Sequence, residues 1–249
     1  LSSKQKNFIN HNNEILRANK VNESGKKIVL IELNELVANT IAFSYFAFCT
    51  SKKYNAKLAA FLPRIPRSFY KRLVWRLKII LGSPSYNIFK SFGVNSLIIP
   101  SINKNILDES NRLANEQLLK INSKDDIEGI TINGVLFGDL IYDYYLNHYT
   151  LPSIDFKSKN FKFHLKYCIQ NILYWNKFFA ENDVAAINVS HTVYTNAIPL
   201  RIAIKHGVNC FQCNESHVYR LTHDNIFAYK DFVNYKRLFS NLEDKEKIS

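Results

Sequence analysis

Ser190, His191 and Thr192 form a short polar segment in the second half of the chain. The apolar run 184–189 before it is typical of a buried strand, and the apolar spacing after it predicts a helix that stops at His206-Gly207. A loop between a strand and a helix offers backbone N–H groups to an anion, and an imidazole there can act as a general acid or base. We therefore predict that His191 is catalytic and that Ser190 and Thr192 bind substrate. The alternative is a histidine that only caps or packs locally.

A second polar group follows the first predicted strand, the apolar run 26–33. Glu32 interrupts this run, so its carboxylate is either paired in the core or faces a cleft. Asn34 and Glu35 come at the carboxyl end of the strand, where a carboxylate could accept a proton from a sugar hydroxyl. We predict Glu35 as a catalytic residue and Asn34 as a substrate-binding residue. A helix cap or a structural ion pair is the alternative.

Gly138 and Asp139 form a third candidate, where glycines predict a turn and then a helix. Asp139 and Asp143 are four residues apart and share one helix face, from which carboxylates could bind a hydroxyl-rich ligand. Gly138 would let such a ligand approach the backbone closely. We predict that Asp139 is catalytic and that Gly138 binds substrate. The alternative for Asp139 is a charge that interacts with the helix macrodipole.

A fourth candidate lies at the end of the last predicted strand, residues 209–214. One carboxylate, one imidazole and one guanidinium within six residues suit a phosphorylated sugar. We predict four substrate-binding residues here, the alternative being a polar surface loop: Asn214, Glu215, His217 and Arg220.

Cys210 and Cys213 form a C-x-x-C within that strand. A redox pair of this kind belongs at a helix N-terminus, and a zinc site needs a second pair of ligands, so we predict buried thiols. No H-x-x-x-H or H-E-x-x-H is present, and we predict no metal. The absence of G-x-G-x-x-G and G-x-x-x-x-G-K-[ST] disfavours a dinucleotide enzyme and a P-loop NTPase.

Strands and helices alternate along the chain, which predicts an α/β class: a Rossmann-like, mainly parallel sheet with helices on both faces. We expect one domain over residues 26–233, between a polar N-terminal segment, 1–25, and a polar C-terminal segment, 234–249. Further strands are predicted at 56–62, 96–99 and, as a short strand-like segment, 127–132. Because the carboxyl ends of parallel strands meet at one edge, one cleft should contain Glu35, Asp139, His191 and Glu215.

The net charge of +12 is unevenly distributed over the 249 residues. Residues 36–107 contain no Asp or Glu, whereas 11 Lys and Arg lie there. The predicted amphipathic helix 67–81 combines Phe69, Tyr70 and Trp75 with basic residues, as interfacial helices do. We expect it to bind an anionic membrane surface through Lys71, Arg72, Arg76 and Lys78. Nucleic acid, an acidic polymer or plain solvent contact are the alternatives.

No signal peptide is recognisable, and no apolar run reaches the roughly 18 residues of a membrane span. We expect a cytoplasmic protein, peripheral at the inner leaflet of the plasma membrane. The chain contains no Met, so we expect it to start inside a longer protein or to lack its first residues.

Three segments together resemble bacterial capsule and lipopolysaccharide glycosyltransferases of the two-domain GT-B type. They are KKIVLIELNELVANTIAFSYFA from residue 26, NGVLFGDLIYDYYL from residue 133 and SHTVYTNAIPLRIAIKHGV from residue 190. The resemblance implies transfer of a sugar from a nucleotide-activated donor to a glycan or lipid-linked acceptor, with no cofactor besides the nucleotide-sugar substrate. In this type the acceptor binds the N-terminal half and the nucleotide binds the C-terminal half.

The length of the chain fits one such half, so we expect the acceptor-binding N-terminal half of a GT-B enzyme, with the donor half missing or separate. Two other classes stay open: a non-catalytic sugar- or nucleotide-binding module, and a basic nucleic-acid-binding protein. The last lacks any helix-turn-helix, zinc-finger or RNA-recognition signature, and no specific nucleic acid is expected.

Overall fold

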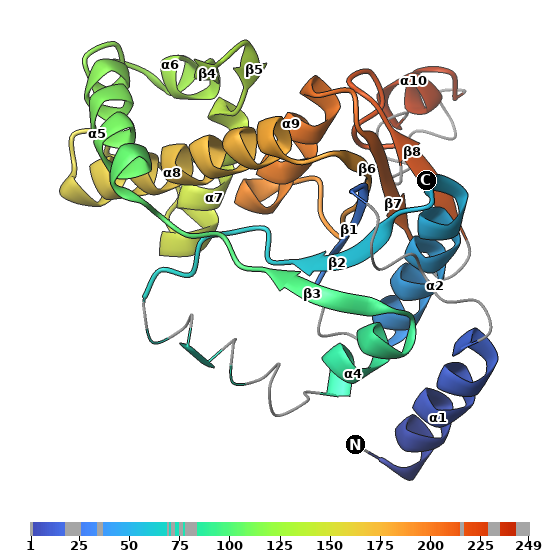
Figure 1. Cartoon of the computed structure of the whole chain (residues 1–249). Helices are drawn as coiled ribbons and strands as arrows, with labels where there is room; N and C mark the ends of the chain where they lie inside the picture. Colours follow the sequence, from blue (N-terminus) through green and yellow to red (C-terminus); the bar gives the residue numbers. More distant parts are fainter. Residues whose placement is uncertain are drawn as a thin grey trace.

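A computed structural model gives the fold of the chain, and it describes residues 2–17, 26–33, 37–68, 70, 73–74, 77, 84–214, 217–228 and 235–242. These residues form an α/β structure around a six-stranded sheet in the order β3-β2-β1-β6-β7-β8 (Figure 1). Every neighbouring pair in this sheet is parallel except β7 and β8, which are antiparallel. Its strands are β1 Ile28–Glu32, β2 Lys57–Phe61, β3 Val94–Ile98, β6 Val184–Asn188, β7 Asn209–Cys213 and β8 Val218–Leu221. The predicted class and the mainly parallel sheet are confirmed.

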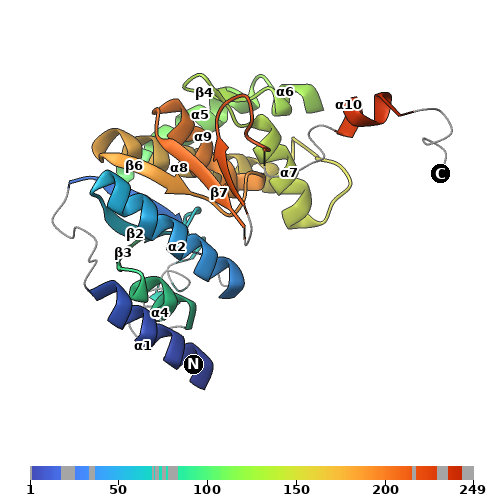
Figure 2. The same ribbon diagram turned by 90° about the vertical axis from the view of Figure 1, so that its right-hand side faces the viewer.

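Helices cover both faces of the sheet, as Figure 2 shows. On one face lie α2 (Val37–Tyr54) and α4 (Pro84–Ser91), with α1 (Ser3–Arg17) packed against α4. The described residues form these further helices: α5 Lys104–Leu118, α6 Lys124–Glu128, α7 Gly138–Tyr149, α8 Lys159–Glu181, the 3-10 turn η1 Tyr194–Ala197, α9 Ile198–Lys205 and α10 Tyr235–Ser240. A short hairpin joins β4 (Thr131–Ile132) to β5 (Val135–Leu136).

The central strand β1 is buried along its whole length, which explains why its sequence is almost continuously apolar. Its side chains alternate between two cores because successive strand residues point to opposite faces. Leu30 belongs to the core beneath α8 and α9, together with Trp175, whereas Val29 and Ile31 belong to the core beneath α2 and α4. Strand β1 therefore fixes both layers at the centre of the molecule.

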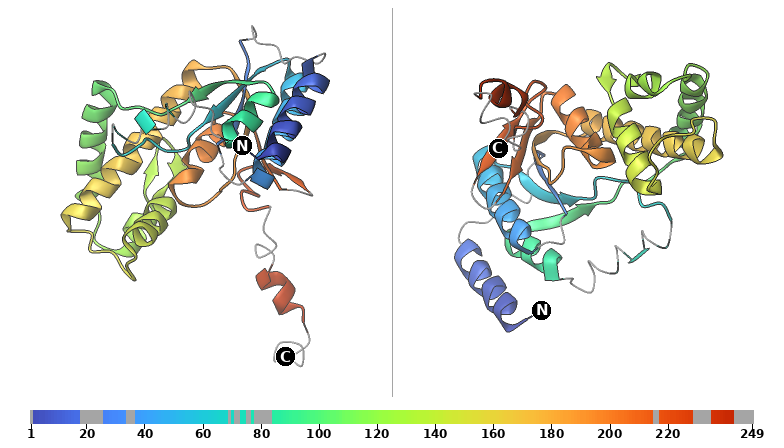
Figure 3. Two further views of the ribbon diagram at one scale, coloured as in Figure 1. Left: turned by 90° about the horizontal axis from the view of Figure 1, so that it is seen from below. Right: turned by 180° about the vertical axis from the view of Figure 1, so that it is seen from behind.

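The N-terminal helix α1 contributes to the second core. Phe8 and Leu16 pack against that core, and the ring of Phe8 lies 6.2 Å from the ring of Phe92, centroid to centroid. The side-chain amide of Asn12 donates to Ser91 in α4 at 2.9 Å. Figure 3 shows α1 beside α4 at the outer side of the fold. The N-terminal residues 3–17 are thus attached by apolar and polar contacts.

The strand-like segment expected at 127–132 is mostly not a strand. Only Thr131 and Ile132 belong to β4, because a capping box at Ser123 starts the helix α6 just before. The Ser123 hydroxyl accepts from the Asp126 N–H, and the Asp126 carboxylate accepts from the Ser123 N–H. Such reciprocal bonds satisfy two otherwise unpaired N–H groups and favour the helix over an extended segment.

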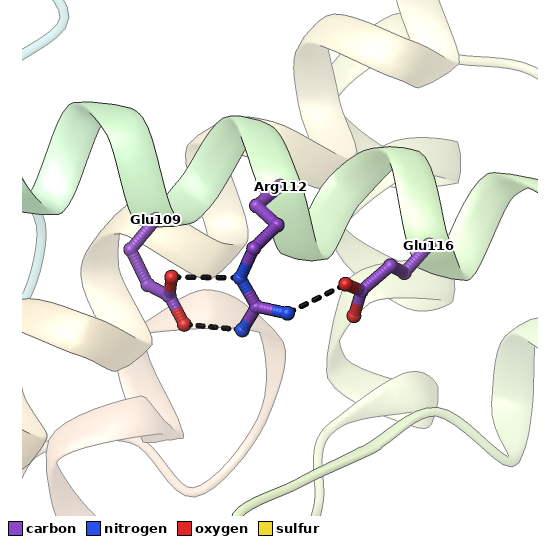
Figure 4. A network of polar contacts seen from close by, with 3 residues as sticks. All are labelled: Glu109, Arg112 and Glu116. Atoms are coloured by element: carbon purple, nitrogen blue, oxygen red, sulfur yellow. Dashed lines mark hydrogen bonds and ion pairs between the residues drawn. The ribbon is translucent and has the colours of Figure 1, made fainter.

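The outer surface of α5 carries a charged network along about two turns of helix. The guanidinium of Arg112 donates twice to Glu109 and once to Glu116, as Figure 4 shows. The three side chains are roughly half exposed, and pairs of this kind contribute only about 0.3–0.5 kcal/mol each to stability.

The order of the chain through the sheet reverses between β1 and β6. From β1 the chain passes through α2 to β2 on one side, whereas from β6 it passes through α9 to β7 on the other side. The loops that follow β1 and β6 therefore diverge at this place. In open parallel sheets ligands bind in the crevice at such a reversal, beyond the carboxyl ends of the strands.

Candidate functional site

A cavity of about 460 Å³ lies at that reversal. It is formed by residues at the carboxyl ends of β1, β2 and β6 and by side chains from α7 and α8. Its charged and polar lining includes Glu32, Arg64, Arg67, His148, Ser190 and His191. One carboxylate, two guanidinium groups and two imidazoles thus share one hollow.

Glu32 is the last residue of β1, and only 3% of it is exposed. Its Oε2 accepts a hydrogen bond of 2.6 Å from the backbone N–H of Ser190, and its Oε1 lies 3.9 Å from Nδ1 of His191. A carboxylate that accepts from a backbone N–H makes a charge-assisted bond, which is stronger than a bond between neutral groups. Glu32 therefore joins the end of β1 to the loop after β6 at the bottom of the cavity.

His191 lies in the loop after β6, and about half of its side chain is exposed. The hydroxyl of Ser190 is 2.7 Å from Nδ1, the same ring nitrogen that faces Glu32. In a serine-hydrolase triad the hydroxyl and the carboxylate contact different nitrogens of the imidazole. The arrangement is therefore not that of a Ser-His-acid nucleophile. Ser190 and Glu32 are positioned to orient the ring of His191 instead.

The loop of residues 62–67, directly after β2, is held by side chains from α8. Three residues spaced four apart make these bonds: Tyr167, Asn171 and Trp175. Trp175 Nε1 donates to the Pro63 carbonyl at 2.9 Å, and the Tyr167 hydroxyl donates to the Ile65 carbonyl at 2.8 Å. The Ile65 N–H donates to Asn171 Oδ1 at 2.7 Å. Because the spacing places all three on one face of α8, they pair the polar backbone groups of a loop that lacks regular structure.

This loop carries Arg64 and Arg67 to the cavity. The guanidinium of Arg67 lies 4.8 Å from the ring centroid of Tyr167, and that of Arg64 lies 5.2 Å from the ring centroid of Tyr144. Arg67 also donates to Nε2 of His148, because a guanidinium has no acceptor and keeps its proton. Within the described part of the chain, neither arginine has a carboxylate oxygen within 4.0 Å. Their charge is thus oriented by aromatic rings and available to an anionic ligand.

The tyrosine beneath Arg67 keeps its proton. Burial raises the pKa of Tyr167 to about 12, so its hydroxyl remains the donor to the Ile65 carbonyl at any physiological pH. The loop conformation therefore does not depend on pH through this contact.

The structure brings only some of the predicted residues together. His191 and Ser190 line the cavity, whereas Thr192 is fully buried beside it and does not. Asn34, Glu35 and Glu215 lie outside the described residues. For Glu32 the sequence left two alternatives, a carboxylate paired in the core or one that faces a cleft. The structure shows both, because Glu32 accepts from the Ser190 N–H and also lines the cavity.

The residues at the end of β7 form a tight connection to β8. Asn214 Oδ1 accepts from the His217 N–H at 2.7 Å, and the Asn214 N–H donates to the His217 carbonyl. Arg220 is exposed on β8, 3.4 Å from Asn209. None of these three predicted binding residues lines the cavity at the reversal.

Asp139 lies at a different place from His191. Both of its carboxylate oxygens accept from Arg201, which also donates to the Leu136 carbonyl at 2.7 Å. This pair joins α7 to α9 and lines a separate cavity of about 410 Å³. We expected one cleft to contain both Asp139 and His191, but the structure places them at two separate cavities.

Close packing against the backbone of α6 requires a glycine at position 138. A Cβ at this position would lie 2.1 Å from the carbonyl oxygen of Ile127 and 2.3 Å from that of Glu128. The end of α6 occupies the space that we had expected a ligand to use. The close approach of two backbones, and not of a ligand, explains this glycine.

Sequence reasoning missed the two arginines as site residues and missed His148 and Tyr144. A signal for the arginines was present: the segment 62–67 follows the second predicted strand directly, at the same edge as Ser190. These arginines had been counted only among the 11 Lys and Arg within residues 36–107. For His148 the sequence holds no comparable signal, because its place depends on how α7 packs.

Cys210 and Cys213 are buried on β7, as predicted. Burial raises the pKa of both thiols, that of Cys213 to about 11, so neither is a thiolate at neutral pH. Across the residues with described positions, no group of three or more Cys, His, Asp or Glu is arranged to bind a metal ion.

Comparison with known protein families, curated proteins and solved structures finds no match to this chain. Among the helices of the described ranges, none has the length and apolar character needed to cross a bilayer.

Proposed function

We propose that this chain binds a sugar phosphate at the β1–β6 reversal and acts as a glycosyltransferase, or as the acceptor-binding half of a GT-B glycosyltransferase, in bacterial surface-polysaccharide synthesis. One observation carries the proposal. Arg64 and Arg67 are held on a fixed loop beside an acid-base pair, Glu32 and His191, in one cavity. Transfer of a sugar from a phosphate ester needs both an anion site and a proton acceptor.

The chemistry assigns one role to each pair. The acceptor hydroxyl attacks the anomeric carbon of the donor sugar, and the bond from that carbon to the phosphate oxygen breaks with its electron pair going to the phosphate. The hydroxyl proton passes to the imidazole of His191, and the carboxylate of Glu32 stabilises the resulting positive charge. Arg64 and Arg67 stabilise the negative charge that develops on the leaving phosphate.

A non-catalytic module that binds a sugar phosphate is the second candidate. The observation that favours it is the pair of arginines, which form an anion site without needing a catalytic group. Such a module needs the anion site but not His191. A donor-hydrolysis and transfer assay with nucleotide sugars separates the two, because only the enzyme releases nucleoside diphosphate. Salt-sensitive binding to arbitrary DNA would instead favour a nucleic-acid-binding protein.

The anion site is tested by titrating the full chain with sugar phosphates and nucleotide sugars. Replacing Arg64 and Arg67 by Gln removes charge-assisted bonds that are worth about 1.5–3 kcal/mol each, so affinity should fall at least ~10-fold. Arg112→Gln on α5 is the matched control and should leave affinity unchanged. Binding that survives in the Arg64→Gln/Arg67→Gln double variant, or that is absent from the wild type at millimolar ligand, would reject the proposal.

A further inference from the structure

A second cavity, of about 320 Å³, lies next to the first and shares part of its wall. Arg67 and Tyr167 line both cavities, together with Ile65 and Pro66 of the held loop. Arg67 is therefore the cationic boundary between two hollows. A ligand that filled both would place its negatively charged centre at this boundary and a separate group on either side.

Part of the lining of the second cavity is aromatic and basic. Phe163, Lys166, Tyr167 and Gln170 line it, and their spacing of three and four residues places them on one face of α8. Phe163 is 72% exposed although it is a large apolar ring. Together with Tyr149 of α7 it offers aromatic surface to a planar or ring-shaped group.

The lining also includes His164, of which only 1% is exposed. Its Nε2 lies 3.0 Å from the Ile141 carbonyl, and because a carbonyl only accepts, Nε2 carries the proton. Burial lowers the pKa of His164 to about 4, so the ring is neutral and Nδ1 is an acceptor. This Nδ1 is buried, and no group of the described residues forms a hydrogen bond with it.

A buried acceptor without a partner costs stability unless another group supplies a donor. A hydrocarbon chain has no such donor, whereas a nucleobase or a ribose has N–H or O–H groups. The aromatic rings, the buried acceptor and the cation at the boundary therefore suit a ring-bearing phosphate ester better than a lipid phosphate.

We propose that the second cavity binds the nucleoside part of a nucleoside diphosphate, with the phosphates at Arg67 and the sugar in the first cavity beside Glu32 and His191. This inference rests on the proposed function, because it takes the first cavity as the sugar-phosphate site. It differs from the arrangement that the GT-B resemblance implies, in which the nucleotide binds the other half of the enzyme. It gives this chain its own donor site.

The test compares binding of the five common nucleoside diphosphates, inorganic pyrophosphate and a neutral disaccharide to the full chain by calorimetric titration. We expect at least one nucleoside diphosphate to bind ~10-fold tighter than pyrophosphate, since stacking and base contacts add to the phosphate contacts. Phe163→Ala and Lys166→Gln should each lower the affinity for that nucleotide severalfold without changing the affinity for pyrophosphate. Arg67→Gln should lower the affinity for both ligands.

Matched controls lie outside the cavity. Tyr45→Ala removes an exposed ring on α2, and Lys162→Gln removes an exposed charge on α8, and neither should change nucleotide affinity. His164→Phe removes the buried acceptor and should lower the affinity for the nucleotide but not the affinity for pyrophosphate. If this variant fails to fold, Phe163→Ala at an exposed position and Lys166→Gln at a half-buried one still decide the question.

Two results would separate the failures. Pyrophosphate binding as tight as every nucleotide, unaffected by Phe163→Ala, would overturn the nucleoside site while leaving the sugar-phosphate site intact. Tighter binding of the disaccharide than of any nucleotide, lost in Phe163→Ala, would assign the second cavity to a neutral glycan. Absence of binding by pyrophosphate, nucleotides and sugar phosphates alike would reject both this inference and the proposed function.

Discussion

The carboxylate of Glu32 and the backbone N–H of Ser190 form a hydrogen bond of 2.6 Å between residues 158 positions apart in the chain. The bond links the ends of two adjacent parallel strands at the point where the strand order reverses. Because the same carboxylate faces His191, the acid-base pair of the candidate site exists only when β1 and β6 are paired. Strand pairing and site assembly are thus one event.

Replacing Glu32 tests this link between stability and the site. Glu32→Ala leaves the Ser190 N–H without its acceptor and should lower the free energy of unfolding by about 1–3 kcal/mol, as loss of one partner of a buried hydrogen bond does. Glu32→Gln keeps an acceptor oxygen and should cost less, while still reducing transfer because the charge beside His191 is lost. Urea denaturation of both variants measures the difference. Equal stability of Glu32→Ala and wild type would contradict the assignment.

His191→Ala should abolish sugar transfer and leave the melting temperature nearly unchanged. The ring is half exposed and contributes little packing, whereas general acid-base catalysis contributes about 10²–10⁴-fold to rate. Activity and thermal melting are measured on the same preparation, with His223→Ala, a largely exposed histidine, as the control. Activity near that of wild type, or a large fall in melting temperature, would make His191 a structural residue.

Asp139→Asn distinguishes a structural from a catalytic aspartate. The side chain of Arg201 is only 10% exposed, so loss of its charged partner should destabilise the chain by about 1–3 kcal/mol. Transfer activity of the folded variant should persist, because Asp139 lies at a cavity separate from that of His191. A variant with wild-type stability and no activity would instead restore the catalytic role that the sequence suggested.

Periodicity and turn residues were sufficient to predict the layered fold. The apolar runs around β1, β2, β6 and β7 identified these four strands to within about two residues at each end, because strands buried on both faces leave a continuous signal. The prediction of a strand at 127–132 was mostly wrong. The apolar residues of this segment resemble a strand, but the capping box at Ser123 starts the helix α6 just before it.

The candidate site was predicted in part, for a physical reason. The rule that ligands bind beyond the carboxyl ends of strands needs only strand positions, and it pointed to the loop of Ser190 and His191, which lines the cavity at the reversal. It cannot tell which loop residues face inward. The positions of Arg64 and Arg67 depend on bonds from α8, about 100 residues away. The Asp139–Arg201 pair depends on how α7 packs against η1, the turn that leads into α9.

His164 gives a prediction on pH dependence. Its pKa is about 4 in the folded chain, mainly through burial, with smaller contributions from Arg67 and His148, and near 6.5 when unfolded. Between these values the unfolded state binds more protons, so stability is fully present above pH 6.5 and is lost as pH falls toward 4. The loss should reach about 3 kcal/mol at most, from 1.36 kcal/mol per pH unit. Unfolding free energies measured from pH 7 to pH 4 test this, and a folded His164→Phe variant should show a flatter profile.

The basic segment 67–81 should bind anionic membranes reversibly. Lys71, Arg72, Arg76 and Lys78 lie outside the described residues, as do Phe69 and Trp75, while Tyr70, Leu73 and Leu77 are exposed. Four basic residues near an anionic leaflet contribute roughly 4 kcal/mol at most, and less as salt rises. Co-sedimentation with neutral and anionic vesicles measures the effect. Equal binding to both, or no loss after the four become Gln, would argue against it.

The contacts between α8 and the loop of residues 62–67 also constrain when the site can form. Tyr167, Asn171 and Trp175 bond loop atoms that were synthesised 102 to 112 residues earlier. A growing chain that does not yet contain α8 therefore cannot hold this loop in place, even if its first strands have already folded. Because contacts of such long sequence separation form slowly, anion binding should appear late during synthesis and refolding, after secondary structure.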